Sequence, residues 1–260
     1  MSATLSPSKS VPSLESRARS PRLSIVIPTY NEEGNIPLLD AAIHAALAKA
    51  AISDYEVIHV DDGSKDRSAD EVRAEVAKDR RVRLIRLKQN SGETAATEAG
   101  IRNARGEIVC IMDCDMQNDP EDLPRIIAKV GEFDCVTGYR EKRGEGDGIV
   151  RIVSSRIANT VRNALSGDTL GLRDSGCTYR AFKRDCAKNV KFYRGMHRFL
   201  PTLFRMEGFS VTEVSVKNNP RKFGQSKYGV WNRVFAASHD LLAVRWMRSR
   251  IVRWEVGEEV

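Results

Sequence analysis

Short apolar runs rich in β-branched residues alternate with longer polar stretches along residues 23–137. Five of these runs predict strands, at 23–28, 55–60, 82–87, 107–112 and 133–137. The stretches between them predict helices, over 35–50, 66–79, 92–104 and 121–130. Strands of about six residues that alternate with helices of about 10–16 residues indicate βαβ units and a mainly parallel sheet. The predicted fold class is therefore α/β.

The alternation weakens after residue 140. Ile149–Leu165 has apolar residues at helical spacing with three arginines among them, which predicts an amphipathic helix. Later strands are predicted at Cys177–Phe182 and Ser210–Val216. A final helical stretch is predicted over 229–254, and it contains all three tryptophans.

These limits divide the chain into three parts. Residues 1–22 are rich in Ser, Pro and Arg and lack apolar periodicity, which predicts a disordered tail. One α/β domain is predicted over 23–228. A C-terminal amphipathic helical extension is predicted over 229–260.

Basic residues are concentrated at the two ends of the chain. The formal net charge of the 260 residues is +7. Residues 1–22 hold four Lys or Arg against one Glu, and residues 217–260 hold nine against four acids, so the part between them is almost neutral. Such ends suit an anionic partner: membrane headgroups, a phosphorylated ligand or nucleic acid.

Composition restricts the class of protein further. Hydrophobic residues at 41% and charged residues at 30% exclude collagen-like, fully disordered and multi-span membrane proteins. The apolar runs are shorter than the roughly 20 residues of a transmembrane helix, and no secretory signal is recognisable. The five cysteines form no CxxC pair, which predicts reduced thiols in a cytoplasmic protein.

Acidic residues directly follow three of the predicted strands. The first strand leads into Pro28-Thr29-Tyr30-Asn31-Glu32, the second into Asp61-Asp62-Gly63-Ser64, and the fourth into Asp113-Cys114-Asp115-Met116-Gln117. Ligands of parallel sheets bind at the carboxyl ends of the strands, so these acids are expected to meet at one edge. Clustered hard oxygen ligands suit Mg²⁺ or Mn²⁺, with a diphosphate completing the coordination. No G-x-G-x-x-G or G-x-x-x-x-G-K-[ST] motif is present, which excludes a dinucleotide-binding Rossmann protein and a P-loop nucleotide-binding protein.

The three acidic segments together resemble the signature of glycosyltransferase family 2 on a GT-A fold. The chain is most similar to the polyprenyl-phosphate glycosyltransferases of the dolichyl-phosphate mannosyltransferase type. Gly138-Tyr139-Arg140, the segment 174–180 (DSGCTYR) and the segment 221–228 (RKFGQSKY) extend the resemblance, which runs from about residue 22 to 245 in the expected order.

The resemblance implies roles for individual residues. The nucleoside pocket would be lined by Pro28, Tyr30, Glu32, Val60 and Asp62. The metal and the diphosphate would be contacted by Asp113, Cys114, Asp115 and Gln117, with Asp113, Asp115 and Gln117 as the metal ligands. Phosphates would be bound by Arg140, Arg221 and Lys227. Asp174 would lie near the sugar or the acceptor, and the catalytic set would be Asp115, Asp174 and Arg140.

The activity that the resemblance implies is a metal-dependent, inverting transfer of one sugar from a nucleotide sugar, GDP-mannose or a UDP-sugar, to a polyprenyl phosphate. A phosphate monoester is largely ionised at pH 7 and needs no strong general base, whereas an alcohol acceptor would need a carboxylate such as Asp174. The chain lacks the Gln-x-x-Arg-Trp motif, which argues against a processive polysaccharide synthase. Ile149–Leu165 and 241–254 combine apolar residues with arginines, so a peripheral position at the cytoplasmic face of a membrane is expected.

Two alternatives remain open at this point. The same fold could act on a soluble saccharide or protein acceptor. A nucleic-acid-binding module that uses the basic ends is the alternative of another class, although no RNP, KH or helix-turn-helix pattern supports it. The sugar, the nucleoside, the polyprenol and the formation of a homo-oligomer are not determined by the sequence.

Overall fold

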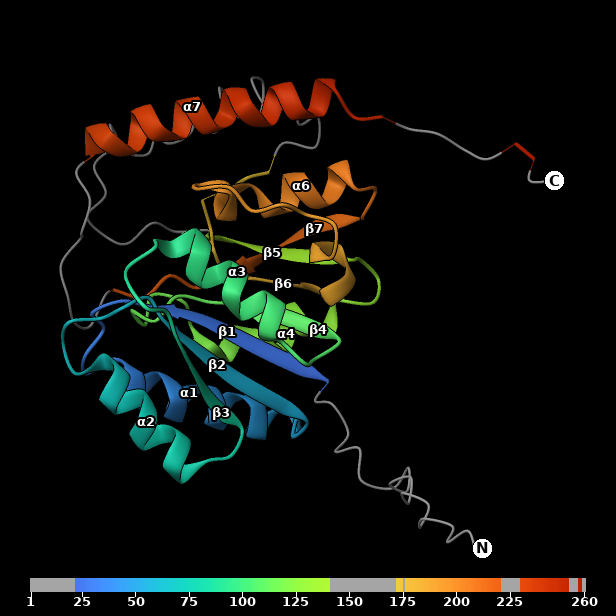
Figure 1. Ribbon diagram of the computed structural model, residues 1–260. Coiled ribbons are helices and arrows are strands. Elements are labelled where there is room, and N and C mark those ends of the chain that lie inside the picture. The colour runs from blue at the N-terminus through green and yellow to red at the C-terminus, as the bar shows by residue number, and fades with distance from the viewer. Residues whose placement is uncertain (1–21, 141–171, 175, 221–229, 253–256, 259–260) are drawn as a thin grey trace, which may run out of the picture.

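The computed structural model describes residues 22–140, 172–174, 176–220, 230–252 and 257–258 (Figure 1). The predicted tail, the predicted helix Ile149–Leu165, and Arg221 and Lys227 lie outside the described residues. The described part forms one mixed sheet covered by helices on both faces. This arrangement confirms the α/β prediction.

The sheet has seven strands in the order β3-β2-β1-β4-β6-β5-β7. Their bounds are β1 (Leu23–Thr29), β2 (Tyr55–Asp61), β3 (Val82–Arg86), β4 (Ile108–Ile111), β5 (Cys135–Arg140), β6 (Arg180–Lys183) and β7 (Val211–Val216). Strands β1 to β4 pair in parallel, and so do β5 and β7. The sheet is therefore mainly parallel, with its acidic segments following neighbouring parallel strands.

One strand runs against the others. β6 lies between β4 and β5 and pairs antiparallel with both. It begins at Arg180 rather than at the predicted Cys177, because its partner β4 ends at Ile111, opposite Arg180. β5 extends beyond the predicted Thr137 to Arg140, because β7 pairs with it as far as that residue.

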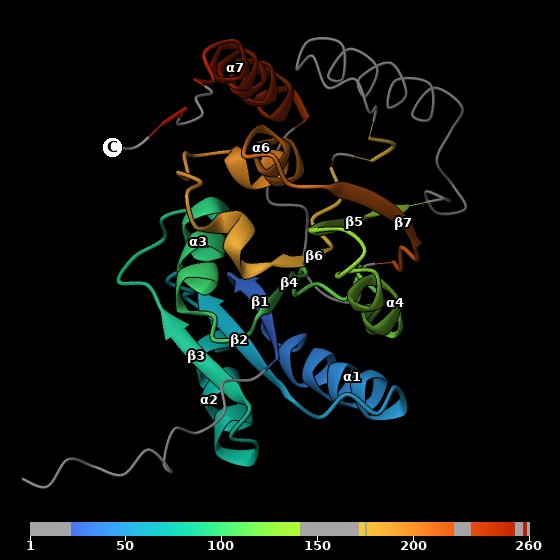
Figure 2. The same cartoon turned by 90° about the vertical axis from the view of Figure 1, so that its right-hand side faces the viewer.

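Two layers of helices cover the sheet (Figure 2). On one face lie α1 (Ile36–Lys49), α2 (Ser68–Lys78) and α4 (Leu123–Ala128), the last preceded by a 3-10 turn, η2 (Pro120–Asp122). On the other face lie α3 (Glu93–Asn103), the 3-10 turns η3 (Arg184–Ala187) and η4 (Met196–Phe199), and α6 (Leu200–Met206). Each layer buries its own hydrophobic cluster against the sheet. The sequence pattern did not predict η4 and α6, which are short and include a proline at Pro201.

A glycine allows helix α3 to pack directly against the sheet. A Cβ atom at Gly100 would lie 2.2 Å from Val26 Cγ1 on β1. A side chain at this position would therefore push α3 away from the strands. The close packing brings the first turn of α3, which begins at Glu93, next to the carboxyl ends of β1 and β4.

The last helix, α7 (Val230–Ser249), lies outside α6 (Figure 2). Leu241 and Val244 are buried in the same hydrophobic cluster as α6, whereas Leu242 and Trp246 face outward with more than half of their surface exposed. This helix is thus amphipathic over its last turns. Within the described residues no helix is both long enough and apolar enough to cross a bilayer. All five cysteines are buried and unpaired, which agrees with the predicted reduced thiols.

Candidate functional site

Hydrogen bonds join the loops that follow β1 and β2 at the carboxyl edge of the sheet. The backbone N–H of Asp62 donates to the carbonyl of Thr29 at 2.9 Å. The backbone N–H of Asn31 donates to Ser64 Oγ at 2.9 Å, and Asn31 Oδ1 accepts from the N–H of Lys65 at 2.9 Å. Parallel pairing of the two strands places these loops side by side, so the first two acidic segments meet as expected.

The carboxylate of Asp62 shapes the loop in front of α3. It accepts the N–H of Ser91 at 2.7 Å and the N–H of Gly92 at 2.8 Å, and the residue is 3% exposed. Gly63 permits this approach, because a Cβ atom there would lie 2.8 Å from the backbone N of Asn90 and its φ is +71°. The role of Asp62 in a nucleoside pocket stays a prediction, and its carboxylate already holds two backbone amides.

The third acidic segment forms a tight loop after β4. Met116 takes a positive φ of 64°, and Asp115 Oδ1 accepts the N–H of Gln117 at 3.1 Å. Asp113 Oδ2 accepts a hydrogen bond from Thr178 Oγ1 at 2.5 Å, just ahead of β6. A positive φ at a residue other than glycine stores strain that is characteristic of functional loops. Asp113 and Asp115 therefore lie in one short loop, close enough for their charges to interact.

The two aspartates repel one another. The pKa of Asp113 is raised from 3.8 to about 7, first by burial and then by the negative charges of Asp115 and Glu93, against the opposing effects of Thr178 and Arg140. A divalent cation would relieve this repulsion, so the oxygens of the loop fit such an ion. Among the described residues, no set of three or more His, Cys, Asp or Glu side chains could hold a metal by itself. Two carboxylates and an amide suit Mg²⁺ or Mn²⁺ only when substrate phosphates complete the coordination.

Arg140 and Asp174 form a bidentate ion pair beside this loop. Arg140 Nε donates to Asp174 Oδ2 at 2.6 Å, and Nη2 donates to Oδ1 at 3.0 Å. Asp174 is 4% exposed, so its charge depends on this guanidinium. A guanidinium has five N–H donors, more than this pair uses, and the phosphate-binding role of Arg140 stays a prediction. The structure thus brings together two predicted site residues that are 34 positions apart.

Other predicted residues have different surroundings. Pro28 lines a pocket beside Asp113, and Tyr30 is half-buried in the loop after β1. Glu32 Oε2 accepts a hydrogen bond from Asn35 Nδ2 at 2.8 Å. Val60 and Cys114 are buried in the hydrophobic clusters, so only their backbones are available to a ligand.

Arg221 and Lys227 lie outside the described residues, but the chain that leads to them starts at the site. The backbone N–H of Asn219 donates to the carbonyl of Gln117 at 2.9 Å. Asn218 forms an antiparallel bridge with Asn118. The phosphate-binding role of Arg221 and Lys227 stays a prediction.

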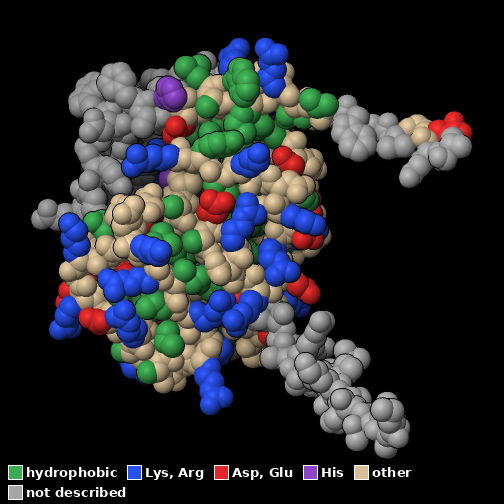
Figure 3. Space-filling view, viewed as in Figure 1, with side chains coloured by type: hydrophobic (Ala, Val, Ile, Leu, Met, Phe, Trp, Pro, Cys, Tyr) green, Lys and Arg blue, Asp and Glu red, His purple; other side chains and the backbone are tan. Residues whose placement is uncertain are grey.

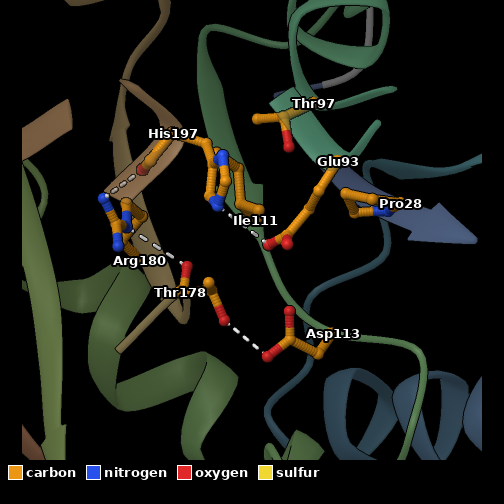
Figure 4. Close-up of a pocket in the computed structure, with 8 residues that line it drawn as sticks. All are labelled: Pro28, Glu93, Thr97, Ile111, Asp113, Thr178, Arg180 and His197. Atoms are coloured by element: carbon orange, nitrogen blue, oxygen red, sulfur yellow. Dashed lines mark hydrogen bonds and ion pairs between the residues drawn. The ribbon is translucent and has the colours of Figure 1, made fainter. Parts of the chain in front are cut away.

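The pocket beside Asp113 contains residues that the sequence did not single out (Figure 4). Glu93 and Thr97 come from α3, Thr178 precedes β6, and His197 comes from η4. Thr178 lies within the segment 174–180 that carried the resemblance, which was the only available signal for it. Glu93 and His197 had no signal, because neither occurs at a metal-ligand or nucleophile spacing.

Comparison with known proteins identifies a family and several relatives of this chain. Residues 24–190 match the model of the family described as glycosyl transferase family 2. The chain is 35% identical over 227 residues to the dodecaprenyl-phosphate galacturonate synthase of Rhizobium johnstonii. It is 34% identical over 226 residues to the undecaprenyl-phosphate 4-deoxy-4-formamido-L-arabinose transferase of Salmonella paratyphi A. Each alignment covers 85% of this chain and 66% of the relative, so the chain spans about two thirds of the length of these relatives.

A solved structure shows the same fold. Glucosyl-3-phosphoglycerate synthase from Mycobacterium tuberculosis, in complex with Mn²⁺, UDP and glucosyl-3-phosphoglycerate, superposes with a TM-score of 0.63 at 18% identity. The match covers 90% of this chain and 81% of that one. It agrees with the expected GT-A fold. With the family model matched over most of the described sheet, the chain belongs to glycosyl transferase family 2.

Proposed function

We propose that this protein transfers a single sugar, with inversion, from a nucleotide sugar to a polyprenyl phosphate at a membrane surface. The names of the two relatives each combine a polyprenyl phosphate with a sugar, and the sugars differ. The sugar is therefore the part of the substrate that varies among similar chains. The donor nucleoside is guanosine or uridine.

The loop after β4 would form the donor site. Its Asp113, Asp115 and Gln117 would hold Mg²⁺ or Mn²⁺ together with the diphosphate. The M. tuberculosis neighbour contains Mn²⁺ with UDP, which supports a divalent ion in this fold. The bound ion would neutralise the charge of the departing nucleoside diphosphate. The side chains of this loop would orient the diphosphate. The turn at Met116, whose φ is positive, keeps the loop in its conformation.

The Arg140–Asp174 pair carries the proposal for the acceptor. A hydroxyl acceptor needs a general base, and Asp174 is the carboxylate that the sequence offers for that role. In the structure both oxygens of Asp174 accept from Arg140, and protonation of Asp174 would break this pair. An acceptor that arrives ionised needs no base, only positioning and charge screening, which Arg140 can provide. A phosphate monoester is such an acceptor, because its second pKa is about 6.

The outer face of α7 suits a membrane surface. Figure 3 shows hydrophobic and basic side chains together over the last turns of this helix. Leu242 is 59% exposed and Trp246 is 64% exposed, with Arg245 and Arg248 exposed beside them. Each Lys or Arg near an anionic leaflet contributes about 1 kcal/mol, so a few of them with an apolar face give reversible attachment.

The acceptor is tested by sugar transfer. The purified chain is incubated with Mn²⁺, with GDP-mannose or a panel of UDP-sugars, and with a short-chain polyprenyl phosphate, the matching polyprenol or a soluble saccharide. We expect transfer to the polyprenyl phosphate alone. Equal transfer to the polyprenol or to the saccharide would refute the acceptor assignment and favour the soluble-acceptor alternative.

Membrane attachment is tested by sedimentation with anionic and neutral liposomes at two salt concentrations. Binding should favour the anionic vesicles, weaken at high salt and fall when Arg245, Arg248 and Arg250 are all replaced by Glu. A matched control carries three replacements by Glu at exposed positions in or next to α2, namely Arg73, Lys78 and Arg80. Equal loss of binding in both triple variants would show that net charge, not the face of α7, is responsible.

A further inference from the structure

The Arg140–Asp174 pair lies where β5 runs beside β7, the edge strand of the sheet (Figure 2). Successive side chains of a strand face opposite sides of the sheet, so Tyr139 and Arg140 at the end of β5 face opposite sides. Arg140 shares its face with Val136 and Val214, which are buried in the hydrophobic cluster of α1 and α4. The pair therefore belongs to the face that α4 covers.

The opposite face carries Tyr139 and Glu213. Glu213 is the partner of Thr137 in the parallel register, two residues before Tyr139, so the two side chains lie on the same face. Cys135 shares this face and is buried in the hydrophobic cluster of α6. Tyr139 and Glu213 therefore lie on the face that α6 covers.

The chain crosses the end of β5 between Arg173 and Asp174. The guanidinium carbon of Arg173 lies 4.8 Å from the centre of the Tyr139 ring, on the α6 face. The next residue, Asp174, forms the bidentate pair with Arg140 on the α4 face. The position of this crossing decides where the Asp174 carboxylate meets the Arg140 guanidinium.

Glu213 holds the backbone at the crossing. Its Oε1 and Oε2 each accept the N–H of Arg173 at 3.0 Å, and Oε1 also accepts the N–H of Asp174 at 3.4 Å. β7, which carries Glu213, pairs with β5 as far as Arg140. The carboxylate thus ties the crossing to the strand pair from which Arg140 projects.

The four charges at the crossing balance one another. Burial raises the pKa of Glu213, and the N–H groups of Arg173 and Asp174 together with the charge of Arg173 oppose this rise. These donors favour the ionised form of Glu213, which accepts hydrogen bonds only. Arg140 in turn lies close enough to Asp113 for their charges to interact, so its orientation bears on the site.

We propose that Glu213 is a positioning residue for the acceptor: by fixing the crossing at Arg173 and Asp174, it sets the Arg140 guanidinium toward the phosphate of the incoming lipid. This assignment rests on the proposed function. Glu213 acts through the backbone of its neighbours and contacts no reacting atom. A guanidinium binds phosphate oxygens through planar, directed N–H donors, so a displacement of about 1 Å weakens the contact and slows transfer.

The test measures transfer to a short-chain polyprenyl phosphate, with Mn²⁺ and the GDP- or UDP-sugar that the wild type accepts. Glu213→Thr removes the carboxylate, and the β-branched threonine still suits a strand. We expect kcat/KM for the acceptor to fall about tenfold or more, as on loss of a hydrogen bond to a charged group. The Kd of the nucleoside diphosphate with Mn²⁺, measured by calorimetry, should stay within about twofold, because the loop after β4 and the ion hold the diphosphate.

Two further variants separate the contact from the charge and from the replacement itself. Glu213→Gln keeps an oxygen that can accept both N–H groups, so it should recover kcat/KM to within about threefold of the wild type. Glu207→Thr, at an exposed position just after α6, is the control and should leave kcat/KM unchanged.

A double-mutant cycle tests the route through Arg140. Arg140→Lys keeps a positive charge opposite Asp174 but loses the bidentate geometry. If Glu213 acts by orienting this pair, the losses of kcat/KM in Glu213→Thr and Arg140→Lys should not multiply in the double variant. Losses that multiply fully would show that Glu213 acts elsewhere and would overturn the assignment.

The outcomes distinguish the two proposals. If the wild-type protein transfers no sugar to the polyprenyl phosphate, the proposed function is refuted, and the assignment of Glu213 is refuted with it. If the wild type is active and Glu213→Thr has a lower Tm but an unchanged kcat/KM, Glu213 has a structural role alone and only its assignment is overturned. Should Glu213→Thr fail to fold, Glu213→Asp, whose carboxylate is one methylene shorter, decides the same question by the same measurement.

Discussion

Replacing Asp113 by Asn should stabilise the metal-free protein above neutral pH and leave its stability at low pH unchanged. The pKa of Asp113 is raised in the folded state from 3.8 to about 7, chiefly by burial and by Asp115. Such a group leaves stability intact below pH 3.8 and costs stability progressively as the pH rises from 3.8 to about 7, because over this interval the unfolded chain has released the proton that the folded protein still holds. Asparagine does not titrate, so the gain from the replacement grows between pH 3.8 and about 7 and is complete above about 7.

The size of the gain follows from the pKa. Raising the pKa from 3.8 to about 7 corresponds to an upper bound on the order of 4 kcal/mol, since one pKa unit is worth about 1.4 kcal/mol. Relaxation of the loop and of Thr178 reduces this figure, and we expect at least about 1 kcal/mol to be measurable. In a domain of this size that corresponds to a rise in Tm of about 2–4 °C.

The same proton competes with a metal ion. With a pKa raised to about 7, Asp113 is mostly protonated at pH 5.5 and mostly ionised at pH 8.5. The apparent affinity of the wild-type protein for Mn²⁺ with a nucleoside diphosphate should therefore rise by roughly tenfold or more over this interval, with release of a proton. Asp113→Asn should bind more weakly and lose this pH dependence.

The assay is thermal unfolding between pH 4.5 and 8.5, with and without Mn²⁺ and diphosphate, together with calorimetry in buffers of different ionisation enthalpy. Asp70→Asn, at an exposed position of α2, serves as the control and should show neither effect. A Tm of Asp113→Asn that matches the wild type at pH 8.5 would refute the assignment of a raised pKa. A pH-independent Mn²⁺ affinity in the wild type would refute the role of Asp113 at the metal.

Three further predictions concern the site and the core. Asp115→Asn should keep its Tm within about 2–4 °C of the wild type but lose Mn²⁺-dependent nucleotide binding, and retention of that binding in a titration would contradict its role as a metal ligand. Arg140→Ala should destabilise the fold by about 3–5 kcal/mol in urea unfolding, because it leaves the buried Asp174 carboxylate without its guanidinium. The Arg140→Ala, Asp174→Ala double variant should recover stability but not transfer, and recovery of both would exclude the pair from catalysis. Phe204→Ala should cost about 3–5 kcal/mol, because Phe204 is fully buried against Phe182, and a smaller loss would show that the second hydrophobic cluster closes around the cavity.

Much of the fold is determined by local sequence patterns. The first four predicted strands and the helices between them occur as predicted, because short apolar runs form strands that the helical layers bury on both faces, and helical spacing of apolar residues buries one face of each helix. The meeting of Asp61, Asp62 and Asp113 at one edge also followed from the sequence, since the carboxyl ends of parallel neighbouring strands coincide. The family resemblance depended on the same segments.

What the sequence could not supply are the contacts between distant segments. Nothing in the alternation of β6 reveals that it runs antiparallel between β4 and β5, because side chains alternate in the same way in either direction. Only that insertion brings Thr178 to Asp113. The pairing of Arg140 with Asp174 likewise depends on where the chain returns after β5.

The pocket beside Asp113 is the clearest case of a feature that tertiary structure alone decided. Glu93 follows a loop held by Asp62, and His197 lies more than 100 residues later in a short 3-10 turn without a helical pattern of its own. Their contact requires α3 to lie close to β1, which depends on the absence of a side chain at Gly100. Local periodicity therefore determined which residues stand at the strand ends, while long-range packing decided which side chains meet there, because those contacts depend on the placement of whole elements.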